Sequence, residues 1–130
     1  MTGRRILAVD NNPFVLTFLD DWLTLAGYEV DTASNGHEAL DKIERTAYDL
    51  IISDVRMPEL DGPGLCRVLA RRGEDALARL LFLTTPHSFE DHRGFLAQSG
   101  VPVLTKPIGV DELRAVVDEM TSRITEPAPA

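Results

Sequence analysis

The chain has 130 residues, of which 44% are hydrophobic and 26% are charged, an ordinary composition for one globular domain. Thirteen basic and 21 acidic residues give a formal net charge of −8 at pH 7, which argues against direct binding to nucleic acid or to an anionic membrane. The single cysteine excludes an intrachain disulfide, and no apolar run is long enough to span a bilayer. The amino terminus has no signal-peptide pattern, so a cytoplasmic location is expected.

Short apolar runs alternate with longer amphipathic segments along the chain. The runs predict strands over residues 6–9, 28–33, 50–53, 79–84 and 101–105. The amphipathic segments predict helices over residues 13–26, 35–47, 65–72, 88–98 and 110–124, the second of them capped by Ser34 or Asn35. Pro102 lacks an N–H group, so the last strand is expected at an edge of the sheet.

Several residues that attract attention have ordinary structural interpretations. The 3.6-residue period of the first helix predicts Trp22 on its buried side, together with Val15, Phe18, Leu19 and Ala26. Cys66 is expected to be a small core residue of the third helix. The three histidines, which are His37, His87 and His92, are expected on the surface because they show no metal-ligand spacing.

The order of the elements defines the fold class. Alternating strands and helices predict a parallel sheet with helices on both faces. Five such units are too few for a closed parallel barrel. We therefore predict an α/β fold, a (βα)5 doubly wound five-stranded parallel sheet with the flavodoxin-like strand order 2-1-3-4-5. One domain is expected over residues 1–124, followed by a polar Pro/Ala segment at 125–130 that is a tail or the start of a linker.

Ligands of such sheets bind at the carboxyl ends of the strands, where the strand order reverses. Asp10 and Asn11 follow the first predicted strand, Asp54 follows the third, Thr84 ends the fourth and Lys106 follows the fifth. Two facing carboxylates suit Mg²⁺, and a lysine beside a hydroxyl suits a phosphoryl group. The set therefore predicts a phosphoryl-accepting site in which one carboxylate is the nucleophile.

The chain resembles the receiver domains of two-component response regulators. Four segments carry the resemblance, at the ends of the predicted strands: residues 6–13 (ILAVDNNP), 53–62 (SDVRMPELDG), 81–85 (LFLTT) and 104–107 (LTKP). It extends over about residues 4–124. It implies a phosphorelay switch in which a histidine kinase or phosphotransfer protein is the phosphodonor. It also implies that the domain is not an enzyme for any separate substrate and catalyses only its own phosphoryl transfer and dephosphorylation.

The resemblance also implies roles for individual residues. Asp54 matches the phosphoacceptor, and Lys106 matches the phosphate-binding lysine, which a cis bond joins to the following proline. Thr84 matches the switch hydroxyl. The implied Mg²⁺ ligands are Asp10, Asp54 and the backbone carbonyl of Arg56. Phosphorylation would change a face made by residues 88–98, 101–105 and 110–124, where an output domain, a target protein or a second copy would bind.

The sequence departs from the family pattern at three places. Asn11 stands where a second acid is usual, which predicts weaker Mg²⁺ binding and leaves its role as a ligand doubtful. Val103 replaces an aromatic residue, so the usual coupling of the threonine to a rotating ring is not expected. Arg56 and Pro86 occupy positions that tune the phosphoryl lifetime. The Arg56 side chain either reaches the phosphoryl oxygens or points to solvent.

Two other functions stay open at this stage. Asn11 and Val103 favour a degenerate receiver that binds a protein partner without phosphorylation. A flavin or nucleotide enzyme on a similar sheet is disfavoured, because residues 10–13 provide no glycine-rich phosphate loop. The acidic pair Asp20 and Asp21 is either a solvated helix face or part of a docking site for a kinase.

Overall fold

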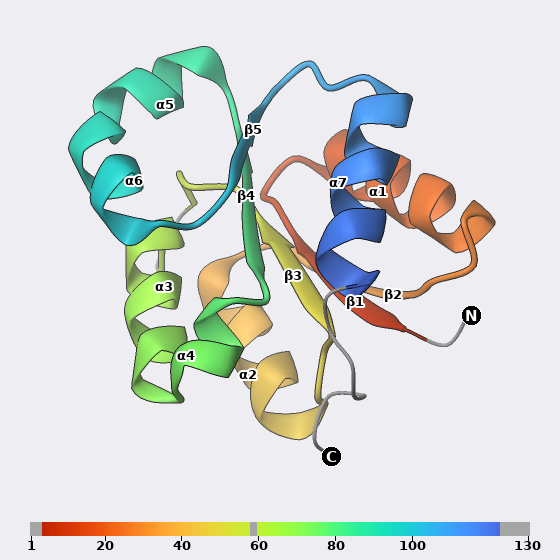
Figure 1. Cartoon of the computed structure of the whole chain (residues 1–130), viewed down its shortest axis with the longest axis horizontal. Coiled ribbons are helices and arrows are strands. Elements are labelled where there is room, and N and C mark those ends of the chain that lie inside the picture. Colours follow the sequence, from red (N-terminus) through yellow and green to blue (C-terminus); the bar gives the residue numbers. More distant parts are fainter. Residues whose placement is uncertain (1–3, 58–59, 123–130) are drawn as a thin grey trace.

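The computed structural model describes residues 4–57 and 60–122. They contain one parallel sheet with the strand order β2-β1-β3-β4-β5, which confirms the predicted topology (Figure 1). The strands are β1 (Arg5–Val9), β2 (Glu29–Ala33), β3 (Leu50–Ser53), β4 (Leu80–Thr84) and β5 (Val103–Thr105). The order reverses between β1 and β3, so the carboxyl ends of these two strands are neighbours.

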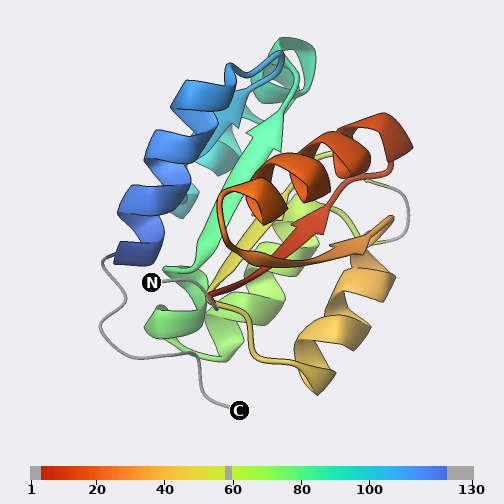
Figure 2. The same ribbon diagram turned by 90° about the vertical axis from the view of Figure 1, so that its right-hand side faces the viewer.

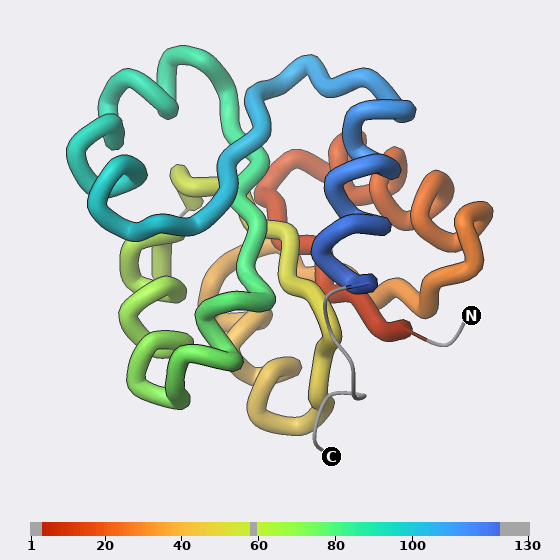
Figure 3. The backbone as a smooth tube through the Cα atoms, in the orientation of Figure 1, coloured from red at the N-terminus to blue at the C-terminus, as the bar shows by residue number. Residues whose placement is uncertain are grey.

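Helices cover both faces of this sheet. In the described residues they are α1 (Pro13–Leu25), α2 (Gly36–Arg45), α3 (Gly62–Arg71), α4 (Glu74–Leu77), α5 (Pro86–Asp91), α6 (Arg93–Ser99) and α7 (Val110–Ser122). α1 and α7 lie on one side of the sheet, and α2 to α6 lie on the other (Figures 1 and 2). The chain passes from β4 to β5 through α5 and α6 (Figure 3).

Two apolar clusters hold these layers together. Along β1, Ile6 and Ala8 pack under α1 and α7, whereas Leu7 and Val9 pack under the opposite helices. Because both sides are covered, the central strands β1, β3 and β4 are apolar except at one terminal position each, which are Arg5, Ser53 and Thr84. Each large side chain buried in this way contributes about 1.5–3 kcal/mol. This explains why uninterrupted apolar runs marked the strands in the sequence.

Side-chain caps fix where α1, α2 and α3 begin. Asn12 accepts a hydrogen bond from the Phe14 N–H at 2.9 Å, and Asn35 accepts one from the Glu38 N–H at 2.8 Å. Asp61 accepts one from the Gly64 N–H at 2.9 Å, so α3 begins at Gly62, earlier than predicted. Each cap contributes about 1 kcal/mol.

The burial predicted for Trp22 is wrong. Trp22 is 40% exposed, whereas Leu19 is buried as predicted and Leu23, which was not predicted, is buried beside it. Trp22 lines a shallow depression between the end of α1 and the start of α7. α1 has apolar side chains around most of its circumference, so the spacing of these residues is compatible with more than one buried face. In the structure the face that carries Leu19 and Leu23 packs against the sheet. The core position predicted for Cys66 is confirmed.

The helix predicted over residues 88–98 is two helices. His92 interrupts it with φ −115° and ψ 18°, which separates α5 from α6. The ring of His92 is half-buried because its Nδ1 lies 2.8 Å from the Ser88 carbonyl oxygen, whereas His37 and His87 are exposed as predicted. The short helix α4 follows Gly73, whose φ of +117° suits glycine, and it was not predicted.

The carboxyl-terminal predictions are tested only in part. β5 is an edge strand, as Pro102 indicated. The predicted last helix is present as α7 up to Ser122, and its final two residues lie outside the described residues, as does the expected polar segment 125–130. Across residues 4–57 and 60–122, no helix combines the length and the apolar character that a membrane span needs.

Gly36 allows α2 to approach the loop before α3. A Cβ atom at this position would lie 1.8 Å from the carbonyl oxygen of Leu60. We expect Gly36→Ala to lower the free energy of unfolding by about 1–3 kcal/mol, since backbone must move to relieve the overlap. Gly94→Ala on α6 is the control, because nothing lies within 4 Å of its added Cβ. Equal denaturant midpoints for the two variants would contradict the close approach.

Candidate phosphoryl-accepting site

Four strand ends bring the predicted side chains together. β1 and β3 pair in register with Val9 opposite Ser53, so Asp10 and Asp54 leave the sheet side by side. Thr84 is the last residue of β4, and Lys106 follows β5 directly. The four side chains meet although the chain separates the first and last of them by 96 positions.

Asp54 is held by contacts to both of its oxygens. Its Oδ1 accepts hydrogen bonds from the Val55 N–H at 2.7 Å and from the Thr84 hydroxyl at 3.0 Å. Its Oδ2 lies 3.3 Å from the Lys106 ammonium nitrogen. Asp54 is only 8% exposed. The exposed part of the residue is where a small reactant or a partner's side chain could reach it.

Lys106 connects the two carboxylates. Its Nζ lies 2.6 Å from Asp10 Oδ2, closer than it lies to Asp54. The other oxygen of Asp10 accepts a hydrogen bond from the Asn12 N–H at 2.9 Å. Two carboxylates and one ammonium leave an excess of one negative charge in a largely buried site. This excess is what a cation would neutralise.

Burial raises the pKa of the Asp10 carboxyl, and the Lys106 ammonium and the Asn12 N–H oppose this shift only in part. The folded state therefore binds a proton at Asp10 more tightly than the unfolded chain does. It follows that this group's contribution to stability falls as the pH rises from the ordinary carboxyl pKa through the raised value. At neutral pH the ionised Asp10 lowers the stability of the fold.

We therefore expect Asp10→Asn to raise the Tm at pH 7 in the absence of metal. An increase of several degrees would be measurable, since 1 kcal/mol shifts the Tm of a domain of this size by roughly 3–6 °C. The gain should shrink as the pH falls towards about 3, below the ordinary carboxyl pKa, where both states protonate the wild-type carboxyl. Thermal unfolding followed by circular dichroism across this range measures it. Asp21→Asn, which changes an exposed acid on α1, is the control. A lower Tm for Asp10→Asn at pH 7 would contradict the argument.

The donor atoms at this site fit Mg²⁺. Mg²⁺ prefers hard oxygen ligands, commonly one or two carboxylates, and keeps several of its waters. Asp10 and Asp54 provide the carboxylates, and the Asn11 amide is exposed at the same strand end. The described residues hold no cluster of three or more His, Cys, Asp or Glu side chains that could bind a metal. A bound Mg²⁺ would therefore depend on amide, backbone and water oxygens, and it would compete with Lys106 for Asp10.

The two threonines at the end of β4 have different contacts. Thr84 is fully buried, and its hydroxyl donates to Asp54. Thr85 is exposed and caps α5 by accepting a hydrogen bond from the Ser88 N–H at 3.1 Å. Of the two residues, only Thr84 therefore contacts Asp54. The peptide bond between Lys106 and Pro107 is cis, in agreement with the expectation from the resemblance.

The Arg56 side chain lies on the surface, as the second of the two alternatives considered from the sequence expects, and it has a partner there. Its guanidinium forms an ion pair with Asp91 at the end of α5, and the side chain is 57% exposed. Sequence reasoning missed Asp91, because the two residues are 35 positions apart and no motif links them. The pair joins the loop that follows the acceptor to α5.

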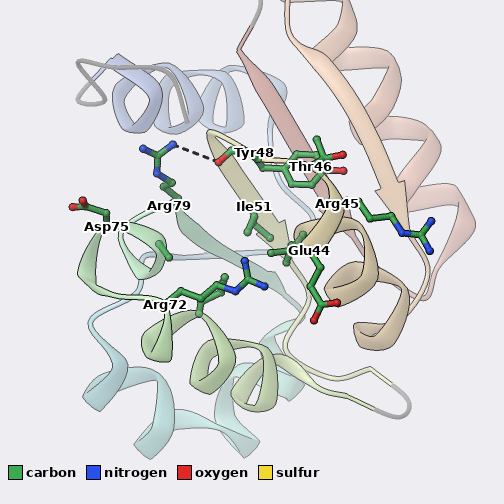
Figure 4. A pocket seen from close by; sticks show the side chains of 12 residues that line it. Glu44, Arg45, Thr46, Tyr48, Ile51, Arg72, Asp75 and Arg79 are labelled. Atoms are coloured by element: carbon green, nitrogen blue, oxygen red, sulfur yellow. Dashed lines mark hydrogen bonds between the residues drawn. The ribbon is translucent and has the colours of Figure 1, made fainter. Parts of the chain in front are cut away.

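A groove of about 570 Å³ lies elsewhere on the molecule, between α2, β3, α3 and α4 (Figure 4). Its apolar floor includes Ile51 and Leu69, and its rim carries Arg45, Arg72 and Arg79. Arg79 donates to the Tyr48 carbonyl at 3.4 Å and so supports the start of β3. The groove is at the amino ends of the strands, away from the paired carboxylates.

Comparison with known proteins identifies the family of this chain. Residues 6–118 match the response regulator receiver domain. The response regulator MprA of Mycobacterium leprae is 36% identical over 126 residues, which cover 97% of this chain and 54% of MprA. The signal receiver domain of a signal transduction histidine kinase from Syntrophus aciditrophicus superposes with a TM-score of 0.84 and 32% identity, covering 98% of this chain and 97% of that one. The receiver domain of the sensor histidine kinase PA1611 from Pseudomonas aeruginosa, which has a magnesium ion coordinated in its active site cleft, superposes with a TM-score of 0.81 and 30% identity over 93% of this chain and 99% of that one.

The fold and the site thus define a phosphorelay type of domain. The chain belongs to the response regulator receiver domain family of two-component systems. It is homologous both to response regulators and to the receiver domains of sensor kinases. It spans about half the length of the curated response regulators that it matches.

Proposed function

We propose that this domain is a phosphorylation-dependent switch in which Asp54 accepts the phosphoryl group. The observation that carries the proposal is the environment of the Asp54 carboxylate. One oxygen is fixed by Thr84 and a backbone N–H, and the other lies beside Lys106. A nucleophile held in this way needs no general base, because a carboxylate is already ionised at neutral pH.

The chemistry follows from these contacts. A carboxylate oxygen of Asp54 attacks the phosphorus of a phosphohistidine or of a small acyl phosphate. The bond from phosphorus to the donor atom breaks, and its electron pair leaves with the donor. Lys106 stabilises the negative charge on the transferring oxygens by its point charge. Thr84 can then give the hydrogen bond it now gives Asp54 to a phosphoryl oxygen, which pulls the end of β4 towards the site.

We assign Mg²⁺ as the cofactor, held by Asp10, Asp54 and the backbone carbonyl of Arg56, with the Asn11 amide as a weaker further ligand. When bound, the ion neutralises charge on the phosphoryl oxygens. The support is the oxygen donor set, the excess negative charge between Asp10 and Asp54, and the magnesium ion in the related receiver of PA1611. Because the domain is itself the phosphoryl acceptor, its chemistry is limited to its own transfer and dephosphorylation.

We infer that the phosphodonor is a histidine kinase or a phosphotransfer protein in the cytoplasm. Family membership supports this inference, since relatives include response regulators and the receiver domains of histidine kinases. The face made by α5, α6, β5 and α7 is the candidate surface for an output domain, a target or a second copy. The acidic composition argues against direct nucleic acid binding.

The geometry favours this switch over a module that binds without phosphorylation. A degenerate receiver has no need to keep its acceptor, switch hydroxyl and lysine in mutual contact. In this domain Asp54 contacts both Thr84 and Lys106 at hydrogen-bonding distances of 3.0 and 3.3 Å. The departures at Asn11 and Val103 bear on metal affinity and on the coupling of the switch, and they leave the acceptor itself intact.

Binding of beryllofluoride, which mimics a phosphoryl group on a carboxylate, tests the proposal. Fluorine NMR of the wild-type domain with Mg²⁺ should show bound fluoride signals that disappear without Mg²⁺. The Asp54→Asn variant should show none, because it lacks the attacking carboxylate. Asp61→Asn, which changes the cap of α3 and leaves Asp54 in place, should bind as the wild type does. Absence of bound signals for the wild-type domain at saturating Mg²⁺ would overturn the proposal.

A further inference from the structure

The ion pair between Arg56 and Asp91 spans the rim of the phosphoryl-accepting site. Arg56 lies two residues after the acceptor Asp54, on the loop that leaves β3. Asp91 is the last residue of α5, and α5 begins two residues after Thr84. The pair therefore joins the segments that follow the acceptor and the switch hydroxyl. Within residues 4–57 and 60–122, the Arg56 side chain forms no hydrogen bond or ion pair other than this one.

α5 has few other attachments that would hold it in place. It is six residues long, and Ser88 is its one buried residue, with Phe89 partly buried against the core. Its first turn is capped by Thr85, and its end is joined to α6 through His92. A short helix of this kind responds strongly to the gain or loss of one contact.

The residue that usually couples the site to this face is replaced here. Val103, on β5, carries no aromatic ring, so a ring cannot move inward when Thr84 moves. At the rim of the site, the structure has the ion pair between Arg56 and Asp91 instead. The flexible Arg56 side chain follows Asp54 by two positions. A phosphoryl group on Asp54 would carry nearly two negative charges in place of the single charge of the carboxylate.

We propose that the Arg56–Asp91 pair is an electrostatic latch that couples the phosphorylation of Asp54 to α5. In the resting domain Asp91 holds Arg56 and so ties α5 to the acceptor loop. In the phosphorylated domain Arg56 exchanges the carboxylate of Asp91 for the phosphoryl oxygens, and α5 is released. The inference rests on the proposed function, since it needs a phosphoryl group on Asp54.

The exchange is favourable on electrostatic grounds. The resting pair is solvent-exposed, with side-chain exposures of 57% and 43%, so it is weak. A phosphoryl group offers a guanidinium more charge and a bidentate geometry with three acceptor oxygens. Once released, Asp91 keeps a neighbour in His87, whose Nε2 lies 3.5 Å from Asp91 Oδ2. This contact lies within α5 and does not tie the helix to the loop.

Hydrogen exchange of the α5 amides, measured with and without beryllofluoride and Mg²⁺, tests the latch. In the wild-type domain the phosphoryl mimic should raise exchange in residues 86–91 by roughly two- to fivefold, the effect of losing one exposed ion pair. Asp91→Asn should show this faster exchange already at rest and should respond little to the mimic. Arg56→Gln should behave in the same way while leaving the contact between His87 and Asp91 in place.

Glu90→Gln is the matched control. It removes the same charge from the adjacent position and breaks only the pair with Arg93 on the surface. It should keep the response of the wild-type domain to beryllofluoride, because the pair between Arg56 and Asp91 stays in place. The latch is overturned if beryllofluoride binds and α5 responds equally in the wild-type, Asp91→Asn and Arg56→Gln domains. Absence of bound fluoride signals in the wild-type domain would instead overturn the proposed function and the latch together.

Discussion

Replacing Lys106 by alanine is expected to slow phosphorylation of Asp54 by about a hundredfold or more. Lys106 is the cation that contacts both carboxylates, at 2.6 Å from Asp10 and 3.3 Å from Asp54. Its loss removes the charge that stabilises the transferring oxygens, and removing one such preorganised group commonly costs a factor of about 10²–10³. The rate of phosphoryl transfer from acetyl phosphate, followed by intact mass, measures the effect.

The same substitution should lower the free energy of unfolding at pH 7 by about 2 kcal/mol. Two largely buried carboxylates would then face each other without a cation, and removing one partner of a buried pair is costly. The cost stays below that of a fully buried pair because the Lys106 side chain is 17% exposed.

Lys42→Ala is the control for both measurements, since Lys42 is the chain's other lysine and contacts the Thr32 carbonyl on β2. A Lys106→Ala domain that is phosphorylated within about threefold of the Lys42→Ala rate would contradict the role of Lys106 as the catalytic cation.

Asn11→Asp is expected to tighten Mg²⁺ binding by about tenfold or more, which is a change of about 1.4 kcal/mol. Asp10, Asp54 and Lys106 together carry one excess negative charge, and an aspartate at position 11 would add a second beside the same strand end. Mg²⁺ gains from a charged oxygen ligand far more than from an amide oxygen. Isothermal titration calorimetry of the two proteins measures the difference.

Asn12→Asp provides the comparison for this variant. It adds the same charge one position further on, where the side chain caps α1 by accepting from the Phe14 N–H, a role that a carboxylate also fills. Its Mg²⁺ affinity should rise by no more than about threefold. Equal gains for the two variants would indicate a general field effect, and no gain for Asn11→Asp would show that Asn11 does not weaken the site.

The strands of the sheet could be predicted from the sequence more reliably than the buried faces of the helices. β1, β3 and β4 are buried on both sides, so their uninterrupted apolar runs marked them unambiguously. α1 is apolar on more than one side, and its period alone did not decide between Trp22 and Leu23 for the core. The break at His92, whose ring contacts the Ser88 carbonyl, is a local feature of the backbone that no hydrophobic period encodes.

The site could be predicted because its members share one topological rule. Asp10, Asp54, Thr84 and Lys106 all stand at carboxyl ends of strands, and the predicted strand order brings these ends together. This rule predicts which side chains lie near one another, but it does not predict which of them form hydrogen bonds or ion pairs. It did not reveal that Lys106 lies closer to Asp10 than to Asp54. Nor did it reveal that Arg56 turns to Asp91, since that pair depends on where a surface helix begins and ends.

The central claim is that Asp54 accepts a phosphoryl group with the help of Mg²⁺. Intact mass spectrometry after incubation with acetyl phosphate, with and without Mg²⁺, tests it most directly. We predict that the wild-type domain gains the mass of one phosphoryl group only when Mg²⁺ is present, and that Asp54→Asn gains none. A wild-type domain that stays unmodified while an active receiver is labelled in parallel, or an Asp54→Asn domain that is labelled equally, would contradict the claim.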